Sequence, residues 1–412
     1  MLPELMTAMA AAADHIRKWP GKTVQLLHHN DADGLTAGAI LIRAFERAGF
    51  AVERYCLEKP YPVVLEKVFK QTDRLIVFAD FAGRIAPLIS DLNQSRNLVV
   101  ILDHHKAAPV EDDRILNLNP ELYGLAGDRD VSASTTAYLF AYAFDPSNAD
   151  LAPLAVIGAV GDGFYVNGVL AGPNRMVALE AERQGTLEIM PNRNGEKYVY
   201  HSPGGALACE LFSTYLDTLG AAGYYRNGPE VGIRAVLVGL DPKTERMLDG
   251  LKALQDELFD KEAERLLNGG LQETEHIQWF HVENRFEPMG VKMIGVFCEK
   301  FKDRLPFSPG KFVAGFQTIP ANIPGFGKIP MDQVKISMRV SAALRRKIRS
   351  GQAPGLDTLL PVATGCIGGF ADACHSLAAA TTIGVGKEAA LIQAMETMLS
   401  DYFANRLEDA SQ

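Results

Sequence analysis

At 412 residues the chain is long enough for two or three domains, and its hydrophobic fraction of 47% is typical of a globular protein with a large core. Its 50 acidic residues outnumber the 41 basic ones and give a net charge of −9, which argues against a protein that clamps long duplex DNA without regard to sequence. No apolar run in the sequence is long enough to cross a membrane, and the N-terminal segment lacks a secretory signal pattern, so we expect a cytoplasmic protein.

The first 165 residues alternate apolar strands with amphipathic helices. Strands are expected at 23–30, 50–57, 73–82 and 97–106, and helices at 34–50, 61–71, 84–95, 131–144 and 151–163. Nearly continuous apolar strands separated by helices are typical of a parallel sheet that is covered on both faces. The sequence therefore predicts an α/β fold whose first and larger domain contains a parallel sheet with helices on both sides.

The alternating pattern is interrupted by a polar stretch at about 190–205. A long helix is expected at 244–270, followed by strands at 276–284, 290–298, 311–319 and 333–341 and by helices at 341–351 and 387–407. We therefore expect a first domain at 1–240, a connecting helix at 241–271 and a smaller α/β domain at 272–412. The active site is expected in the cleft between the two domains.

Acidic and histidine side chains gather at the predicted carboxyl ends of the strands in the first domain. Four clusters share this placement: His29 with Asp31 and Asp33, Asp80, Asp103 with His104 and His105, and Asp162. Because ligands of parallel sheets bind at the carboxyl ends of the strands, we expect the clusters to meet at one edge. Clustered carboxylates need positive charge between them, and Lys106 is the one basic residue directly next to them in sequence.

Divalent cations would supply that charge. Imidazole and carboxylate ligands without thiolate suit Mn²⁺ best, followed by Mg²⁺ or Fe²⁺. Two such ions can activate a water molecule and hold a phosphoryl oxygen. The pattern therefore predicts a two-metal site that hydrolyses phosphoester or phosphoanhydride bonds.

Ordinary structural roles are the alternative for each of these residues taken alone. A carboxylate at the end of a strand is often the N-cap of the next helix, which applies to Asp33 and Asp80. Asp162 lies between two glycines, a pattern typical of a turn. Strand alternation directs His28 to the face opposite His29, so we expect a structural role for His28.

The clusters resemble the motifs of the DHH phosphoesterase superfamily, in its RecJ-like and oligoribonuclease-like versions. The triplet Asp103–His104–His105 matches the motif that names the family, and the sequences at 29–34, 78–83 and 158–163 resemble three further motifs. The resemblance implies a site for two ions, usually Mn²⁺. It implies these roles: His29 and Asp31 bind one ion, Asp33, His104 and Asp162 bind the other, Asp80 bridges both, His105 faces the substrate phosphate, and Asp103 orients a neighbouring imidazole.

The resemblance extends less strongly to the second domain. That domain often carries a glycine-rich, substrate-binding signature near GGGH in the family, whereas here five residues separate Gly368 and Gly369 from His375. An insertion or a remodelled loop would explain this spacing. The resemblance still implies that these three residues bind substrate.

A second candidate substrate surface lies on the strand predicted at 333–341. Lys335, Ser337 and Arg339 alternate with apolar residues, so they share one face of the strand. Together with the resemblance, this pattern predicts that the face binds phosphate; the alternative is the solvated face of an edge strand. The basic run at 345–349 is expected to be either a solvated helix face or part of a nucleic-acid channel.

The resemblance restricts the reaction class more than the substrate. Few aromatic residues and an acidic balance favour a short single-stranded oligonucleotide or a nucleotide. We therefore predict a metal-dependent phosphodiesterase or exonuclease that acts on short oligonucleotides or related nucleotides. Alternatives are a RecJ-like exonuclease on longer single strands and a catalytically inactive, nucleotide-binding scaffold, with cyclic dinucleotides, pAp and pyrophosphate as further candidate substrates. No membrane partner is expected, and a homodimer is one candidate assembly.

Overall fold

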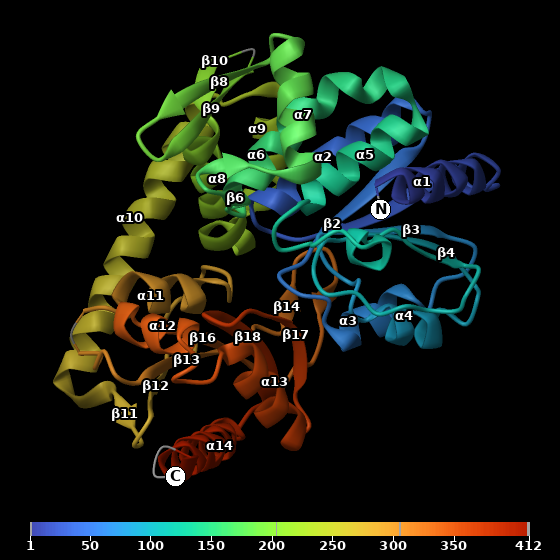
Figure 1. The fold of residues 1–412 in the computed structure, drawn as a ribbon. Helices are drawn as coiled ribbons and strands as arrows, with labels where there is room; N and C mark the ends of the chain where they lie inside the picture. The colour runs from blue at the N-terminus through green and yellow to red at the C-terminus, as the bar shows by residue number, and fades with distance from the viewer. Residues whose placement is uncertain (1, 203, 305, 410–412) are drawn as a thin grey trace. The chain divides into compact units, whose positions relative to one another are not determined.

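A parallel sheet of five strands lies in the N-terminal part of the computed structural model, which describes residues 2–202, 204–304 and 306–409 (Figure 1). The strands lie in the order β2–β1–β3–β4–β5 and comprise β1 (Thr23–His28), β2 (Ala51–Cys56), β3 (Leu75–Ala79), β4 (Leu98–Leu102) and β5 (Ile115–Asn117). Every residue of β3 and β4 is buried, as expected for apolar strands that are covered on both faces. The predicted α/β fold with a parallel sheet is confirmed.

Helices cover both faces of this sheet (Figure 1). One face carries α3 (Pro62–Val68) and α4 (Ala86–Asn93), and the other carries α1 (Leu2–Arg17), α2 (Ala32–Arg47) and α5 (Ala133–Phe144). The apolar helix α6 (Ala152–Gly161) packs against α2, α5 and α8 (Cys209–Asp217). This packing places the N-terminal ends of α2 and α5 beside the carboxyl edge of the sheet. Asp162 is the C-cap of α6, so the expectation that it follows a strand is wrong.

The strand order reverses at β1. The chain passes from β1 outward to β2 and then returns to β3 on the other side of β1. Such a switch point leaves a crevice at the carboxyl ends of the two central strands, where ligands bind in open α/β sheets. Because His28 pairs with Ala79 in the β1–β3 register, His29 and Asp80 follow these two strands at the same level.

The polar stretch at 190–205 forms a small antiparallel sheet instead of a break between structural elements. The short strands β6 (Tyr165–Val166) and β7 (Val169–Leu170) and helix α7 (Gly172–Arg183) lead to β8 (Leu187–Asn192), β9 (Gly195–Ser202) and β10 (Gly205–Ala208). Tyr198 and Tyr200 alternate along β9 and belong to the hydrophobic core. Their period of two is the strand signal that the surrounding Gly and Asn residues obscure. Helices α9 (Gly228–Val238) and α10 (Pro242–Arg265) follow.

The chain divides into two compact units: Met1–Lys252 with Ile323–Gly327, and Ala253–Asn322 with Lys328–Gln412. The second unit contains a mixed sheet in the order β11–β12–β13–β16–β18–β17. Its strands are β11 (Gln272–Glu273), β12 (Ile277–His281), β13 (Phe312–Thr318), β16 (Gln333–Arg339), β17 (Phe370–Cys374) and β18 (Ala378–Gly384), and β14 (Asn322–Ile323) and β15 (Gly327–Lys328) form a separate pair.

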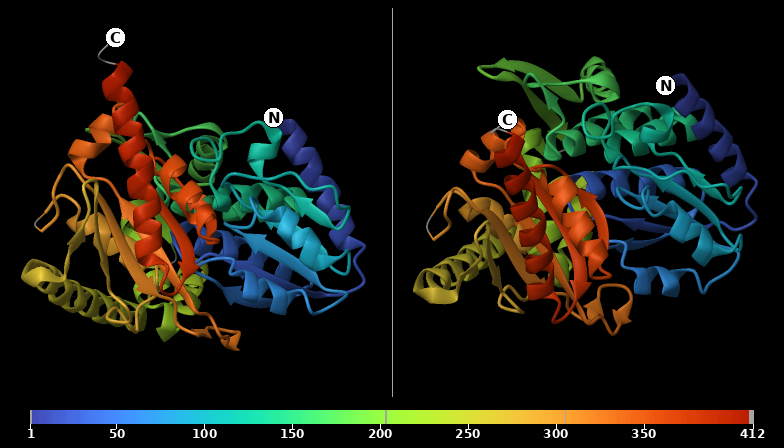
Figure 2. Two further views of the ribbon diagram at one scale, coloured as in Figure 1. Left: turned by 90° about the horizontal axis from the view of Figure 1, so that it is seen from below. Right: turned by 60° about the horizontal axis from the view of Figure 1, so that its bottom comes forward.

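Helices also cover this second sheet (Figure 2). The helices α13 (Leu356–Cys366) and α14 (Glu388–Asp409) pack on one face, around a core that contains Leu360 and Met395. Helix α11 (Met293–Phe301) packs on β13 and β16 from the other face, and α12 (Ala342–Arg349) follows β16. None of the described helices is long and apolar enough to cross a membrane.

The strand predicted at 290–298 is wrong, because this segment forms helix α11. Ile294, Phe297, Cys298 and Phe301 are buried and recur at the i, i+3, i+4, i+7 spacing of one helix face. Their apolar and β-branched neighbours resemble a strand locally. Gly315 of β13 admits the helix, since a Cβ there would lie 2.7 Å from Ile294 and 2.8 Å from Cys298.

Candidate metal centre

The turn between β1 and α2 brings His29 and Asp31 together. Asp31 is the N-cap of α2, and its Oδ1 accepts a hydrogen bond from the Gly34 amide at 2.9 Å. Its other oxygen, Oδ2, lies 2.7 Å from His29 Nδ1. Gly34 is required sterically, because a Cβ at this position would lie 2.6 Å from the Cβ of His29. One carboxylate thus caps a helix and also faces the histidine.

Asp33 is buried in the first turn of α2 and points at the N-terminus of α5. Its two oxygens accept hydrogen bonds from the backbone amides of Ala133, at 2.7 Å, and Ser134, at 2.9 Å. Amides at a helix N-terminus favour negative charge, so they hold this carboxylate in one orientation. Asp33 Oδ2 also lies 3.9 Å from Nε2 of His104.

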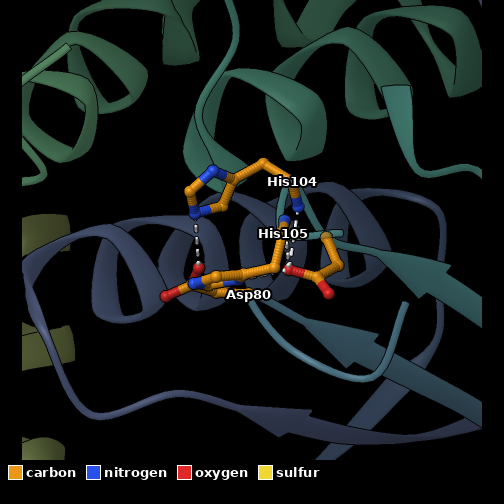
Figure 3. Close-up of side chains that lie close together, drawn as sticks. Asp80, His104 and His105 are labelled. Atoms are coloured by element: carbon orange, nitrogen blue, oxygen red, sulfur yellow. Dashed lines mark hydrogen bonds and ion pairs between the residues drawn. The ribbon is translucent and has the colours of Figure 1, made fainter. Parts of the chain in front are cut away.

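Asp80 lies between His29 and His104, and Figure 3 shows its contact with His104. Its Oδ2 is 3.4 Å from His29 Nδ1, and its Oδ1 is 3.4 Å from His104 Nε2. The side chain is only 2% exposed, and its backbone has a φ of 66°, in the left-handed region that non-glycine residues rarely adopt. Such a conformation is typical of residues that the surrounding structure holds for function.

Several polar atoms at this centre lie near charged groups but form no hydrogen bond of good geometry among the described residues. They are His29 Nδ1, both carboxylate oxygens of Asp80, and His104 Nε2, and all four are buried. Buried polar atoms without partners are rare, and an ion or a water is their usual explanation. Two sets of ligand atoms, each within 4.8 Å of one another, meet here: His29 with Asp31 and Asp80, and Asp33 with His104 and Asp162. These oxygen and imidazole donors fit a pair of divalent cations.

Asp103 anchors the triplet after β4. It accepts hydrogen bonds from the amides of Gly83 and His104, each at 2.8 Å, and from His105 Nδ1, also at 2.8 Å. The His105 ring packs against that of His104, with 4.2 Å between their centroids, and remains 25% exposed (Figure 3). Asp103 therefore orients His105, while the ring of His105 stays accessible.

The pKa values at this centre follow from burial and from the crowding of carboxylates. Burial, together with the charges of Asp80 and Asp162, raises the pKa of Asp33 to about 7. Burial opposes protonation of His29, but Asp31 and Asp80 outweigh it and raise the His29 pKa to about 10. Without a cation, protons therefore occupy positions where a metal ion would bind.

The sequence did not indicate the residues that orient His104. The His104 Nδ1 donates a hydrogen bond to the carbonyl of Gly127 at 2.5 Å, which directs Nε2 toward Asp80. Gly127 has no room for a side chain, since a Cβ there would lie 1.6 Å from the carbonyl oxygen of His104. The Glu121 carboxylate accepts a hydrogen bond from the Gly127 amide, and the Asn119 side chain donates one to the His105 carbonyl. The only sequence signal was the Asn-Pro and Gly content of this loop.

Lys335, Ser337 and Arg339 share one face of β16, and α11 covers part of it. Ser337 is 1% exposed, and a Cβ at Gly295 of α11 would lie 2.8 Å from its hydroxyl oxygen. Arg339 forms an ion pair with Glu299 at 3.3 Å and donates a hydrogen bond to Ser337. Lys335 is 6% exposed. The phosphate-binding role of this face stays a prediction, because these contacts hold the side chains within the second unit.

Gly368, Gly369 and His375 lie at opposite ends of β17. The two glycines form the turn after α13, and His375 lies in the turn between β17 and β18, where its amide donates to the Ala378 carbonyl. The five intervening residues are strand β17, which spans about 15 Å. The structure therefore does not bring the glycines and the histidine together.

Sequence comparison identifies the N-terminal part. Residues 23–159 match the family model described as DHH family, N-terminal domain. An uncharacterized protein of Methanocaldococcus jannaschii is 32% identical over 176 residues, which cover 40% of this chain and 38% of that protein. The match thus spans less than half the length of that curated relative.

Solved structures share the fold over nearly the whole chain. The DHH domain of a member of the s1p family of ribosomal proteins has a TM-score of 0.62 at 15% identity, covering 96% of this chain and 91% of that one. RecJ from Thermus thermophilus, in complex with Mn²⁺, has a TM-score of 0.60 at 16% identity, covering 96% and 55%. An exonuclease RecJ bound to manganese has a TM-score of 0.56 at 16% identity, covering 95% and 94%. Residues 23–159 therefore form a DHH family N-terminal domain, and the solved structures extend the likeness in fold to the rest of the chain.

Proposed function

We propose that the protein is a metal-dependent phosphodiesterase that hydrolyses short single-stranded oligonucleotides or related nucleotides. The observation that carries the proposal is the pair of ligand sets that meet at Asp80, where His29 Nδ1, His104 Nε2 and both Asp80 oxygens are buried without a well-formed hydrogen bond among the described residues. The match to the DHH family, which comprises metal-dependent phosphoesterases and nucleases, supports this reaction class. In this proposal the first unit carries the chemistry and the second binds substrate.

Six side chains would hold two ions: His29, Asp31, Asp33, Asp80, His104 and Asp162. Divalent cations bound there would polarise the phosphoryl group and lower the pKa of the attacking water. We propose Mn²⁺ as the ion, with Mg²⁺ as the alternative, since RecJ structures with each of these ions share the fold.

His105 is the proposed catalytic residue that faces the substrate. Asp103 accepts a hydrogen bond from its Nδ1, which leaves Nε2 to donate a proton to a phosphoryl oxygen. Burial alone would raise the pKa of Asp103, but His105 and the Gly83 amide hold it well below its usual range, so Asp103 stays ionised. A charged Asp103 keeps His105 in one tautomer and favours its protonated form.

Hydrolysis of bis-p-nitrophenyl phosphate tests the reaction class. With Mn²⁺ we expect turnover that EDTA abolishes and added Mn²⁺ restores. Asp80→Ala should lower kcat/KM by at least about 100-fold, because it removes the carboxylate between the two ligand sets. The control Asp91→Ala removes an exposed carboxylate on α4 and should leave turnover unchanged. Turnover that persists in EDTA would contradict the metal-dependent reaction.

Substrate class is tested separately, with Mn²⁺ present throughout. The panel contains a dinucleotide, a single-stranded 20-mer, pAp, a cyclic dinucleotide and pyrophosphate. The proposal expects the short oligonucleotide to give the highest kcat/KM. A RecJ-like exonuclease would prefer the 20-mer, and a nucleotide-binding scaffold would hydrolyse none of the five.

A further inference from the structure

Helix α12 presents a concentrated positive charge on the second unit. Its eight residues, Ala342–Arg349, include Arg345, Arg346, Lys347 and Arg349. Arg346, Lys347 and Arg349 are exposed, and Arg345 is half-buried. Within the described ranges, no ion pair links any of these four side chains to a carboxylate, in a chain whose acids outnumber its bases. We call the four side chains the α12 basic surface.

The helix is anchored by contacts that do not involve these cations. Leu344 is buried, and Ser341 caps the N-terminus by accepting the Leu344 amide. Asp303 accepts the amide of Ala342 at 2.7 Å. Basic residues in the last turn also complement the helix dipole, but that effect stabilises a helix by less than about 1 kcal/mol and needs no cluster of this size. The exposed cations are therefore available to a ligand outside the helix.

We propose that the α12 basic surface binds the phosphate backbone of a single-stranded nucleic acid. The helix is about 12 Å long, which corresponds to roughly three or four phosphates of a stacked strand. Three of the four cations are arginines, whose planar guanidinium groups match phosphate oxygens in bidentate pairs. An anionic membrane is the less favoured partner, because Leu344 is buried and leaves the exposed face without a large apolar side chain to insert.

This inference rests on the proposed function and extends it to the substrate class. A dinucleotide has a single phosphodiester, so it cannot occupy a reaction centre and also offer three further phosphates to α12. Binding by α12 therefore raises kcat/KM on strands of several nucleotides relative to a chain without these cations, and leaves the preference for short substrates at the metal centre unchanged. Counterion release makes such binding depend on salt, with a slope of about −0.7 in log K against log salt per phosphate contact.

The test measures binding of fluorescein-labelled dT20 by anisotropy, with the full chain in EDTA so that no hydrolysis occurs. The variant Arg346→Gln/Lys347→Gln/Arg349→Gln should bind about tenfold more weakly at moderate salt, and its salt slope should be smaller by about 2. The control Lys18→Gln/Lys197→Gln/Lys243→Gln makes the same charge change at three exposed lysines elsewhere, and should keep the wild-type slope.

Three outcomes would overturn the inference: an unchanged slope in the α12 variant, an equal loss in the control variant, or wild-type protein that binds vesicles of anionic lipid but not dT20. Hydrolysis rates test the same inference independently of binding. With Mn²⁺ the α12 variant should lose about tenfold in kcat/KM on the 20-mer and none on a dinucleotide. If neither substrate is hydrolysed by the wild type while dT20 binding shows the expected slope, the proposed function fails and the α12 surface stands.

Discussion

His28 has a positioning role that its place on the far face of β1 did not indicate. Its Nδ1 donates a hydrogen bond to the carbonyl of His29 at 2.7 Å, and Arg54 lies 3.5 Å from its Nε2. Burial and the Arg54 charge lower the pKa of His28 to about 3, so the ring is neutral. The ring thereby holds the backbone of a proposed metal ligand, while Glu230 pairs with Arg54 behind it.

Replacing His28 separates this positioning role from simple packing. We expect His28→Leu, which keeps an apolar volume but loses the donor, to weaken Mn²⁺ binding by about tenfold. His28→Asn should restore most of the affinity, because its amide can donate from nearly the same position. Calorimetric titration of metal-free protein measures the affinity, and thermal melting reports folding separately. Equal affinities in the two variants would show that the hydrogen bond does not matter.

At the residue scale, the sequence predicted which side chains meet but not what holds them. His29, Asp80 and His104 follow strands that the apolar runs predicted. The hydrogen bond from His104 to Gly127 joins residues 23 positions apart through an irregular loop. Its acceptor is a backbone carbonyl, a group that every residue type carries. Backbone partners of this kind leave almost no trace in a sequence.

At the scale of elements, the packing of α6 against α2 and α5 supports Asp33, a proposed metal ligand. Gly158 of α6 faces three polar groups: a Cβ there would lie 2.3 Å from Ser134 Oγ, 2.4 Å from Thr36 Oγ1 and 2.5 Å from Asp33 Oδ1. We expect Gly158→Ala to reduce the free energy of unfolding by about 1–3 kcal/mol, since the helices must move apart. Urea denaturation of the metal-free protein measures the loss.

Gly250 provides the matched control for this substitution. It lies in α10, and a Cβ there would meet no atom within 4 Å. Gly250→Ala should therefore stabilise the protein by about 0.4–1 kcal/mol, because alanine restricts the unfolded chain and favours the helix. A similar change in stability for both variants would argue against the steric explanation at Gly158.

Two elements show why the second unit was harder to predict than the first. The first sheet consists of parallel strands that are buried throughout, such as β4, and these give continuous apolar runs. In the second unit, α11 is a short helix whose β-branched residues suit a strand equally well. Strand β17 consists largely of small residues, and its pairing with β18 includes an irregularity between Ala371 and Cys374. Tertiary contacts decided both elements, and local sequence carries little record of them.

For the molecule as a whole, the net charge of −9 includes buried carboxylates at the proposed metal centre. Asp33, Asp80 and Asp103 are each at most 2% exposed. Burial and nearby acids raise the pKa values of Asp33 and Asp80, whereas the carboxylates raise the pKa of His104 well above its usual value despite burial. In the absence of metal, protons therefore offset part of the crowded negative charge.

Binding of Mn²⁺ to the metal-free protein should release these protons. A ligand whose pKa lies above the experimental pH must lose its proton before it binds, so affinity rises as pH rises. Since the His29 pKa is raised to about 10, its proton should make the dissociation constant fall by about tenfold per pH unit between pH 6 and pH 8. Asp33, with a pKa raised to about 7, adds a further fall that levels off above pH 7. Calorimetry in two buffers with different ionisation enthalpies counts the protons released. An affinity that is independent of pH, with equal heats in both buffers, would mean that Mn²⁺ binds without displacing protons from these ligands.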